Sequence, residues 1–344
     1  MRIGGASVNN KIRVARTKGG RRSDRVALTE SLQRKPKRVR KNAYRAHLAA
    51  ANFKPTEDWT NEEAQRLYEV ARFPYKVDRI LYEDCIEGMK KLPAESIDVV
   101  VADPPFGLSF TGTESIYNRD YRLVREGYRE AVGDYQQFSI RWIQQLPRIM
   151  KNTSSAWIFS GWTNLGDVLS AVRRSGLTLV NHIIWKYQFG VFTQRKFVTS
   201  HYHILFLTKS AKYYFNKIMH YPLDVWEINR TYRAGEQKNS TKLPEELVLR
   251  CIEFTSRPGC LILDPFMGNG TTAVAAKGSY RHHIGFEINK SMRDVIDANL
   301  NSTQHGQFYT PYADRPDELV RSARRRFRIG NLRQSDQERI VAWT

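Results

Sequence analysis

The sequence lacks any long hydrophobic run and has few cysteines. No apolar stretch among its 344 residues approaches the roughly 20 residues that a membrane-spanning helix needs. The basic N-terminus is not followed by the apolar segment of a secretory signal. The three cysteines, Cys85, Cys251 and Cys260, lack the paired spacing of metal ligands. These absences predict a soluble cytoplasmic protein with no membrane partner and no metal, whose cysteines are small buried residues of a reducing compartment.

Acidic residues are too few to balance the basic ones. The chain has 55 lysines and arginines against 35 acids, a formal net charge of +20. Residues 1–45 hold fifteen of these bases and only two acids, a net charge of +13. Such clustering favours a polyanionic partner, and nucleic acid above all. We interpret 1–45 as a basic arm that binds phosphates without reading sequence. A localisation signal or a solvated tail would have the same composition.

One strand-like segment ends in an acidic turn. Residues 96–102 are apolar and rich in β-branched side chains, which favours a short buried strand. Asp103 follows, and then Pro104 and Pro105, which cannot continue a strand ladder because prolines lack an N–H group. The turn should present a carboxylate, backbone carbonyls and the Phe106 ring at the carboxyl edge of a sheet, where open α/β sheets bind ligands. A carboxylate beside a carbonyl can accept both hydrogens of an amino group, while the ring stacks on a flat heterocycle. An ordinary strand-ending turn has the same residues.

A second acidic turn contains glycines. A buried strand at 260–263 precedes the segment Asp264 to Thr272, which opens a helix at 273–277. Glycines let the backbone approach a ligand closely, and a helix N-terminus offers free N–H donors. Glu287 ends the next strand, 17 residues after Gly270, and is placed to bind ribose hydroxyls. The segment lacks the full G-x-G-x-x-G pattern of a dinucleotide site, and Asp264 would repel a pyrophosphate. S-adenosylmethionine, which carries a sulfonium, an ammonium and a ribose, fits these residues better.

The remaining pattern alternates helices and strands. Helices are predicted at 60–72, 85–92, 136–150, 164–175 and 244–252, and strands at 78–84, 156–159, 178–185, 198–208 and 281–287. Thr60 and Glu63 have the spacing of a capping box. The strands at 178–185 and 198–208 are predicted to form an antiparallel hairpin. His201 and His203 should share one face of it, as structural or substrate-facing residues, since a metal site would need a third ligand.

Two polar segments interleave aromatic and basic side chains. They are 111–135 and 186–237, and this mixture suits a surface that contacts nucleic acid. Surface loops with a few core tyrosines would look similar. The candidate DNA-binding residues are Arg122, Arg125, Arg195 and Lys196. A further six arginines and no acid lie between 321 and 333, as a second phosphate contact or a solvated tail.

The two acidic turns, in this order, resemble the S-adenosylmethionine-dependent DNA amino-methyltransferases that modify adenine N6 or cytosine N4. Asp103-Pro104-Pro105-Phe106 is similar to the D-P-P-[YF] catalytic motif of that family. Phe266-Met267-Gly268-Asn269-Gly270 is similar to its F-x-G-x-G cofactor loop. The catalytic motif precedes the cofactor loop, which is the beta arrangement, and the likeness covers about 77–300. The Pro-Cys dipeptide of cytosine-C5 enzymes is absent from the sequence.

The resemblance implies roles for individual residues. The implied catalytic residues are Asp103, Pro104, Pro105 and Phe106. The implied cofactor-binding residues are Asp84, Cys85, Asp103, Lys242, Asp264, Pro265, Phe266, Gly268, Gly270, Thr271, Thr272 and Glu287. Within this set, Asp84 would help to hold the adenine of the cofactor and Glu287 its ribose. The target base would be flipped out of double-stranded DNA, since its amine is otherwise paired, and methylated by direct displacement.

The resemblance also implies a fold and partners. We expect a Rossmann-like α/β fold of the class I methyltransferases, with an open, mostly parallel sheet of seven strands, one antiparallel edge strand and helices on both faces. The expected division is a basic N-terminal extension at 1–75, a methyltransferase domain at 76–305 with a target-recognition region at about 186–240, and an arginine-rich tail at 306–344. The expected partners are double-stranded DNA in the nucleoid, a second copy of the chain as a homodimer, and a cognate restriction enzyme.

Three other functions remain open from the sequence. Asp103 favours adenine, because cytosine-N4 enzymes of this family often carry serine there, but an N4-cytosine enzyme is the main alternative. Methyltransferases that act on protein glutamine or RNA usually place the cofactor loop before the catalytic motif, unlike this chain. A non-catalytic DNA-binding scaffold would not need to retain Asp103, Phe106, Gly268 and Gly270.

Overall fold

The structure is a computed structural model that describes residues 53–105, 134–188, 190, 194–219, 222–230 and 242–315. Phe106, Arg122 and Arg125 lie outside the described residues, as do the basic arm at 1–45 and the arginines at 321–333. Within the described part, no helix is long and apolar enough to cross a membrane.

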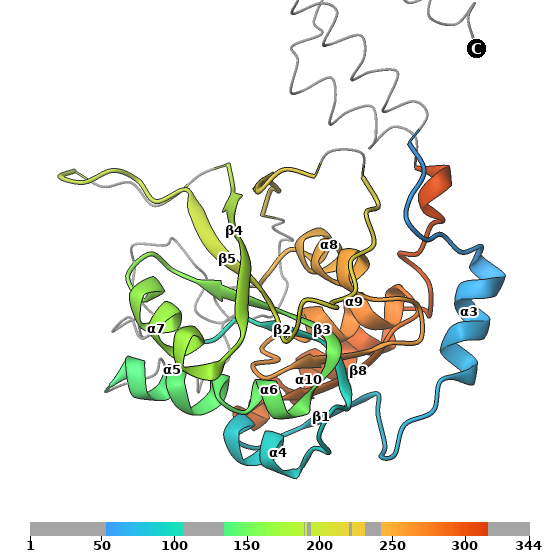
Figure 1. The fold of residues 1–344 in the computed structure, drawn as a ribbon, viewed down its shortest axis with the longest axis horizontal. Coiled ribbons are helices and arrows are strands. Elements are labelled where there is room, and N and C mark those ends of the chain that lie inside the picture. The colour runs from blue at the N-terminus through green and yellow to red at the C-terminus, as the bar shows by residue number, and fades with distance from the viewer. Residues whose placement is uncertain are drawn as a thin grey trace, which may run out of the picture. The chain divides into compact units, whose positions relative to one another are not determined.

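Eight strands form one sheet across the described residues (Figure 1). They are β1 (Arg79–Leu81), β2 (Ile97–Ala102), β3 (Met150–Ser160), β4 (Thr178–Lys186), β5 (His201–Thr208), β6 (Val225–Glu227), β7 (Leu261–Asp264) and β8 (His282–Phe286). Their order is β1-β8-β7-β2-β3-β5-β4-β6. Only β5 pairs antiparallel with its neighbours, β3 and β4, so seven of these strands share one direction. The predicted mostly parallel α/β fold is confirmed.

Two details of the sheet differ from the expectation. The described sheet has eight strands where seven are expected, because the three-residue β6 adds to its far edge. The antiparallel strand β5 lies inside the sheet and not at its edge, because β4 pairs with its outer side. A strand of three residues is too short to show an alternating pattern, which is why the sequence does not reveal β6. The predicted antiparallel hairpin is confirmed as β4 and β5.

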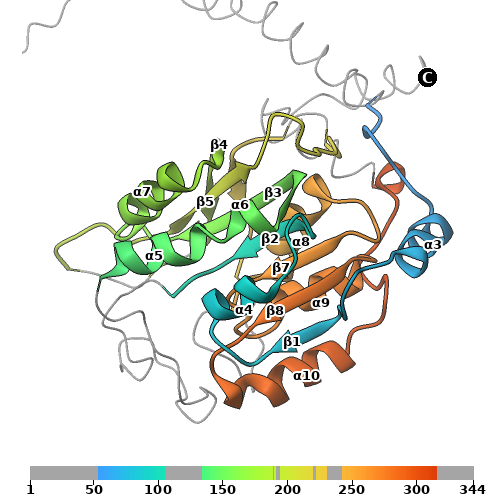
Figure 2. The same ribbon diagram turned by 60° about the horizontal axis from the view of Figure 1, so that its bottom comes forward.

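Helices cover both faces of the sheet (Figure 2). They are α3 (Asn61–Val70), α4 (Cys85–Lys91), α5 (Tyr135–Ile143), α6 (Leu146–Ile149), α7 (Leu165–Ser175), α8 (Glu245–Thr255), α9 (Thr271–Gly278) and α10 (Arg293–Asn301), with short 3-10 turns η3 (Lys290–Met292) and η4 (Tyr312–Asp314). Strand β2 shows how the layers form. Val100 and Ala102 pack with α4, α5 and α7, while Val99 and Val101 pack with α8 and α9, because successive side chains of a strand point to opposite faces. A strand buried on both faces needs the continuous apolar run that β2 has.

The segments on either side of 76–305 contact this body. Thr60 caps α3 in the predicted capping box with Glu63, and the ring of Tyr68 in α3 stacks on that of His282 at 4.0 Å. The Asp58 carboxylate accepts hydrogen bonds from the backbone N–H groups of Tyr312 and the following residue, both at 2.8 Å. The division of the chain at 75 and 305 stays a prediction.

The cysteines largely match the expectation. Cys85 and Cys251 are buried free thiols, and burial raises the pKa of both. Cys260 is only partly buried, so the prediction that all three are buried is wrong for this residue. It directly precedes β7.

Candidate active site

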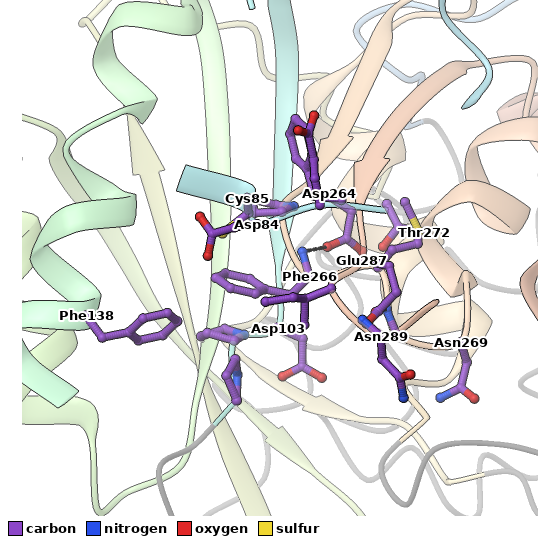
Figure 3. Close-up of a pocket in the computed structure, with 18 of the residues that line it drawn as sticks. Asp84, Cys85, Asp103, Phe138, Asp264, Phe266, Asn269, Thr272, Glu287 and Asn289 are labelled. Atoms are coloured by element: carbon purple, nitrogen blue, oxygen red, sulfur yellow. Dashed lines mark hydrogen bonds between the residues drawn. The ribbon is translucent and has the colours of Figure 1, made fainter. Parts of the chain in front are cut away.

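The carboxyl ends of the parallel strands meet at one edge of the sheet and border a cavity of about 810 Å³ (Figure 3). Asp103, which directly follows β2, lines this cavity together with Pro104 and Pro105. Asp264 from the end of β7 and Glu287 from the end of β8 line the same cavity. Its volume is within the range of small-molecule sites. The fold therefore brings together the two acidic turns, which lie about 160 residues apart in the sequence.

Two glycines shape the wall of this cavity. Gly268 and Gly270 have φ angles of 54° and 80°, a conformation that residues with a side chain rarely adopt. A Cβ atom on Gly270 would also lie 3.1 Å from Cγ2 of Ile296. Helix α9 begins directly after this turn, at Thr271, so its first N–H groups face the cavity end of the loop.

Asp264 is a fully buried carboxylate at the end of β7. Its Oδ1 accepts a hydrogen bond from the backbone N–H of Phe266 at 2.8 Å, and Thr272 donates a second one. Burial raises the pKa of Asp264 to about 7, because it outweighs these two hydrogen bonds, and the nearby Glu287 raises it further. A cation in the cavity would favour the charged form, so this carboxylate suits a positively charged ligand.

Glu287 is held by backbone donors from two loops. Its Oε2 accepts from the N–H of Gly268 and its Oε1 from the N–H of Asn289, both at 2.7 Å. Burial raises the pKa of Glu287 in spite of these bonds. The backbone N–H of Ile288 also donates to this carboxylate. An ionised carboxylate has about four acceptor positions, so one remains for a ligand hydroxyl group. One hydrogen bond thus joins the glycine turn to Glu287, the predicted ribose-binding residue.

Other predicted residues border the same cavity. Asp84 is exposed and caps α4, where its Oδ1 accepts from the N–H groups of Ile86 and Glu87. Cys85 lies beside it in the cavity wall. Lys242 pairs with Glu245 at 3.7 Å and lines both this cavity and a second, polar one of about 240 Å³. The complete set of predicted cofactor residues in the wall of the main cavity is Asp84, Cys85, Asp103, Lys242, Asp264, Pro265, Phe266, Gly268, Thr271, Thr272 and Glu287. Gly270 shapes the loop without lining the cavity.

Helix α5 contributes a wall that the sequence reasoning missed. Asp134, Gln137, Phe138 and Arg141 line the cavity, and the ring of Phe138 lies 5.9 Å from that of Phe266. Their spacing of three and four residues puts them on one face of a helix, which is the signal that could have identified them. The apolar spacing of this helix indicates a core contact instead. Asn289, after β8, is a second missed residue of the wall.

Comparison with known proteins identifies the family. The family model of the N6/N4 methyltransferases, described as DNA methylase, matches residues 97–298, more than half of the chain. The chain belongs to this family of S-adenosylmethionine-dependent DNA amino-methyltransferases. The matched range contains both acidic turns and Glu287, and it begins after Asp84 and Cys85.

Individual relatives extend over about two thirds of this methyltransferase. It is 29% identical over 245 residues to the type II methyltransferase M.HinfI of Haemophilus influenzae, covering 65% of this chain and 68% of the relative. It is 26% identical over 248 residues to the type II methyltransferase M.HpaI of Haemophilus parainfluenzae, covering 66% and 76%.

Solved structures share the fold of this methyltransferase. The M1.HpyAVI–SAM complex has a TM-score of 0.50 at 21% identity and covers 65% of this chain and 98% of that one. The PvuII DNA methyltransferase, described as cytosine-N4-specific, has a TM-score of 0.52 at 15% identity and covers 73% and 97%.

Two of the predicted DNA-binding residues of the methyltransferase, Arg195 and Lys196, do not line the cavity. Arg195 and Lys196 are exposed in the loop between β4 and β5. Arg230, in the same predicted recognition region, lies over the rings of Trp185, Tyr187 and Tyr202 at 4.5 to 5.1 Å. Cation–π packing holds this arginine.

The histidines of β5 contact a third histidine. Nε2 of His182 in β4 lies 2.8 Å from Nδ1 of His203, whose ring is 5.2 Å from that of His201. Burial lowers the pKa of His203 to about 4, and the two neighbouring histidines lower it further. No group of three histidine, cysteine or acidic residues in the described ranges has the arrangement of a metal site. The three rings pack against one another across the hairpin.

Proposed function

We propose that this protein methylates the N6 amino group of adenine in double-stranded DNA. The observation that carries this proposal is the meeting of Asp103, Asp264 and Glu287 around one cavity. It puts an acceptor for an amino group beside acids suited to a cationic ligand that contains a ribose. This arrangement supports transfer of a methyl group to an amine.

The cavity residues fit S-adenosylmethionine. The raised pKa of buried Asp264 leaves a carboxylate that gains from a cation nearby. The start of α9 offers backbone N–H groups, and Glu287 keeps an acceptor position for a ribose hydroxyl. Asp84 and Cys85 border the end of the cavity proposed to take the adenine ring of the cofactor. When bound, S-adenosylmethionine supplies an electrophilic methyl group.

Asp103 and Pro104 are proposed to hold the target amine. The carboxylate of Asp103 and the backbone carbonyl of Pro104 would accept one amine hydrogen each, which draws the nitrogen lone pair out of conjugation with the ring. The Phe106 ring, which lies outside the described residues, is proposed to stack on the flipped base. Positioning of this kind can account for roughly 7–11 kcal/mol of a reaction barrier. No covalent enzyme intermediate is needed.

Adenine is proposed over cytosine on the identity of one residue. The family resemblance links a leading aspartate, here Asp103, with adenine and a leading serine with cytosine N4. The likeness to the PvuII enzyme, at 15% identity, concerns the fold alone. N4-cytosine methylation would use the same geometry and would change only the shape of the base pocket.

The surroundings of the site are proposed to serve DNA recognition. We assign the target-recognition region to about 186–240 and phosphate binding to the basic arm. The similarity to two type II methyltransferases supports a role beside a restriction enzyme that cuts the same DNA sequence.

Methyl transfer from labelled S-adenosylmethionine to unmodified double-stranded DNA tests the proposal, with nucleoside analysis of the product. We expect N6-methyladenine. N4-methylcytosine would keep the mechanism and replace the base. No labelled nucleoside, with the cofactor bound, would contradict the proposed function and favour a scaffold role or a non-DNA substrate.

The Asp103→Ala variant tests the catalytic assignment. We expect kcat to fall by at least about 100-fold, as when one well-placed polar group is removed from an active site. Cofactor affinity should change by less than about 3-fold. Asp297→Asn is a matched control, because Asp297 is an exposed acid on α10 that does not line the cavity. Turnover by Asp103→Ala at the wild-type rate would show that Asp103 is not catalytic.

A further inference from the structure

We propose that Phe197 inserts into the DNA duplex as an apolar wedge at the target base. This inference rests on the proposed function. The side chain of Phe197 is 99% exposed, the highest value among the large hydrophobic residues that the structure describes. Full exposure of an aromatic ring has no role in folding, because burial is what makes such a ring stabilising. The ring is therefore available for a partner.

The topology places Phe197 at the edge of the sheet that carries the candidate active site. Strand β4 runs parallel to β2 and β3, and it ends at Lys186, which pairs with His201 at the start of β5. The loop between them thus leaves the sheet at the same edge as Asp103, which follows β2. In Figures 1 and 2 the coloured parts of this loop extend away from the body of the protein. A duplex bound over the cavity would lie within reach of this edge.

The base of the loop is held firmly. The N–H of Tyr187 donates to the carbonyl of Ser200 at 3.0 Å, which continues the hairpin beyond the sheet. At Gly190 the two sides of the loop come so close that a Cβ atom would lie 2.0 Å from the carbonyl oxygen of Thr199. Residues 194–197 therefore stand beyond a closely packed stem, to which Val198 belongs.

Arg230 fixes the stem from the side. Its guanidinium lies over the rings of Tyr187, Trp185 and Tyr202, and its backbone N–H and carbonyl bond the Gln188 side chain at 3.0 and 3.2 Å. An anchored stem fixes the point at which the loop leaves the sheet, since supported elements are positioned better than free loops.

The residues beside Phe197 have the chemistry of a DNA contact. Arg195 and Lys196 precede it and are exposed, and Val198 follows with 41% of its surface exposed. Cationic side chains bind phosphates and set the register on the duplex, while an apolar side chain can enter between base steps. A flipped base leaves a gap in the stack that an inserted ring can fill. Cations flanking an exposed aromatic ring match this division of roles.

Rescue by a weakened base pair tests the wedge. The substrate is a duplex with the sequence that the wild-type protein methylates, in a fully paired form and in a form with an abasic site opposite the target base. For Phe197→Ala we expect kcat/KM to fall about 10- to 100-fold on the paired duplex, because stacking and base extrusion each involve a few-fold to 100-fold in rate or affinity. On the abasic duplex the loss should be below about 3-fold, since the target base is already unpaired. Phe197→Trp should stay within about 5-fold of the wild type on both.

Two control variants separate the wedge from other roles. Leu179→Ala removes an apolar side chain of 40% exposure at the start of β4, on the opposite edge of the sheet. It should leave kcat/KM unchanged on both duplexes. The double variant Arg195→Gln with Lys196→Gln should weaken binding to both duplexes equally, because phosphate contacts do not depend on the base pair.

Several outcomes would overturn the wedge. An unchanged Phe197→Ala enzyme would leave the proposed function intact and assign the ring to a different partner. An equal loss on both duplexes would make Phe197 a general DNA contact. The rescue pattern in Trp162→Ala and not in Phe197→Ala would assign the wedge to Trp162, which is 62% exposed after β3 at the same edge. Failure of the wild-type protein to methylate any DNA would instead contradict the proposed function itself.

Discussion

At the residue scale, a bound ligand should change the charge state of Asp264. It is fully buried, and its pKa of about 7 means that both protonation states are populated near neutral pH. Burial disfavours the charge, and the hydrogen bonds from Thr272 and Phe266 offset that effect only in part. A bound cation would shift the balance to the carboxylate. Ligand binding and proton release should therefore be coupled.

We predict that the affinity for S-adenosylmethionine falls as the pH decreases through about 7. The sign follows from the raised pKa, since below it the protonated acid must lose its proton before it can pair with the cation. The dissociation constant should rise by at most tenfold per pH unit, and binding at pH 7 should release a fraction of a proton to the buffer. Isothermal titration calorimetry in buffers of different ionisation enthalpy measures both quantities.

The matched variant for this prediction is Asp264→Asn. It keeps the size of the side chain and removes the titration, so its affinity should be lower and independent of pH between 6 and 8. S-adenosylhomocysteine, which lacks the sulfonium charge, should release fewer protons from the wild-type protein. Equal proton release by both ligands would show that the sulfonium does not drive it, and release retained in Asp264→Asn would assign the titration to another group.

At the element scale, a polar cluster joins helix α3 to strand β8. Asp78, with a φ angle of 56°, accepts a hydrogen bond from Nδ1 of His282 at 2.7 Å and one from the backbone N–H of His283 at 3.0 Å. Nε2 of His282 lies 3.0 Å from the carbonyl of Tyr68 in α3. Burial tends to raise the pKa of Asp78, but the hydrogen bonds from the two histidines hold it below its ordinary value. This cluster connects the amino edge of the sheet to the preceding segment.

We predict that Asp78→Asn lowers the free energy of unfolding by about 2 kcal/mol at pH 7, the scale of a hydrogen bond to a charged group. Asparagine tolerates the positive φ angle, so the loss reports the carboxylate and not the backbone. Because the folded pKa is depressed, the stabilisation is complete above the unfolded pKa of about 3.9 and is lost as the pH falls further toward the folded pKa. Urea unfolding at several pH values measures it.

The exposed acid Asp297 again provides the control for this comparison. Asp297→Asn should change the free energy of unfolding by less than about 0.5 kcal/mol at every pH. The difference in the free energy of unfolding between wild type and Asp78→Asn should become smaller below pH 4. A gap that stays constant down to pH 2 would show that the charge of Asp78 contributes nothing.

Also at the element scale, local patterns account for what the sequence could and could not predict. The sequence predicts strands β2, β7 and β8 and the glycine turn, because apolar runs, prolines and glycines each carry a local signal. The sequence does not predict the contact of His182 with His203 or the cavity face of α5, because the partners in each contact are distant in sequence. The register between β4 and β5 brings the histidines together, and the packing of α5 against Phe266 turns one face of α5 to the cavity. The roles of the predicted site residues stay predictions.

At the scale of the whole molecule, the positive charge is unevenly shared. Residues 1–45 carry +13 of the net +20, which leaves +7 for the other 299 residues. The part of the chain that contains the candidate active site is thus closer to charge balance than the arm. Long-range attraction to DNA should come mainly from the arm, while base recognition depends on the folded domain. Affinity and specificity should then respond to different changes.

We predict that neutralising the arm flattens the salt dependence of DNA binding without changing the methylated sequence. The variant replaces Arg34, Lys35, Lys37, Arg38, Arg40 and Lys41 with glutamine, so chain length is kept. Each lost phosphate contact should reduce the slope of log K against log salt by about 0.9, to a limit of roughly 5 for six contacts. Fluorescence anisotropy between 50 and 300 mM salt measures the slope, and sequencing of methylated genomic DNA identifies the target. Three exposed lysines on α4 and β4, Lys90, Lys91 and Lys186, are replaced by glutamine as a partial control, for which the slope should change by well under the roughly 0.9 per residue expected for the arm. A changed target sequence in the arm variant would show that the arm reads bases, and the separation between a phosphate-binding arm and a sequence-reading domain would be wrong.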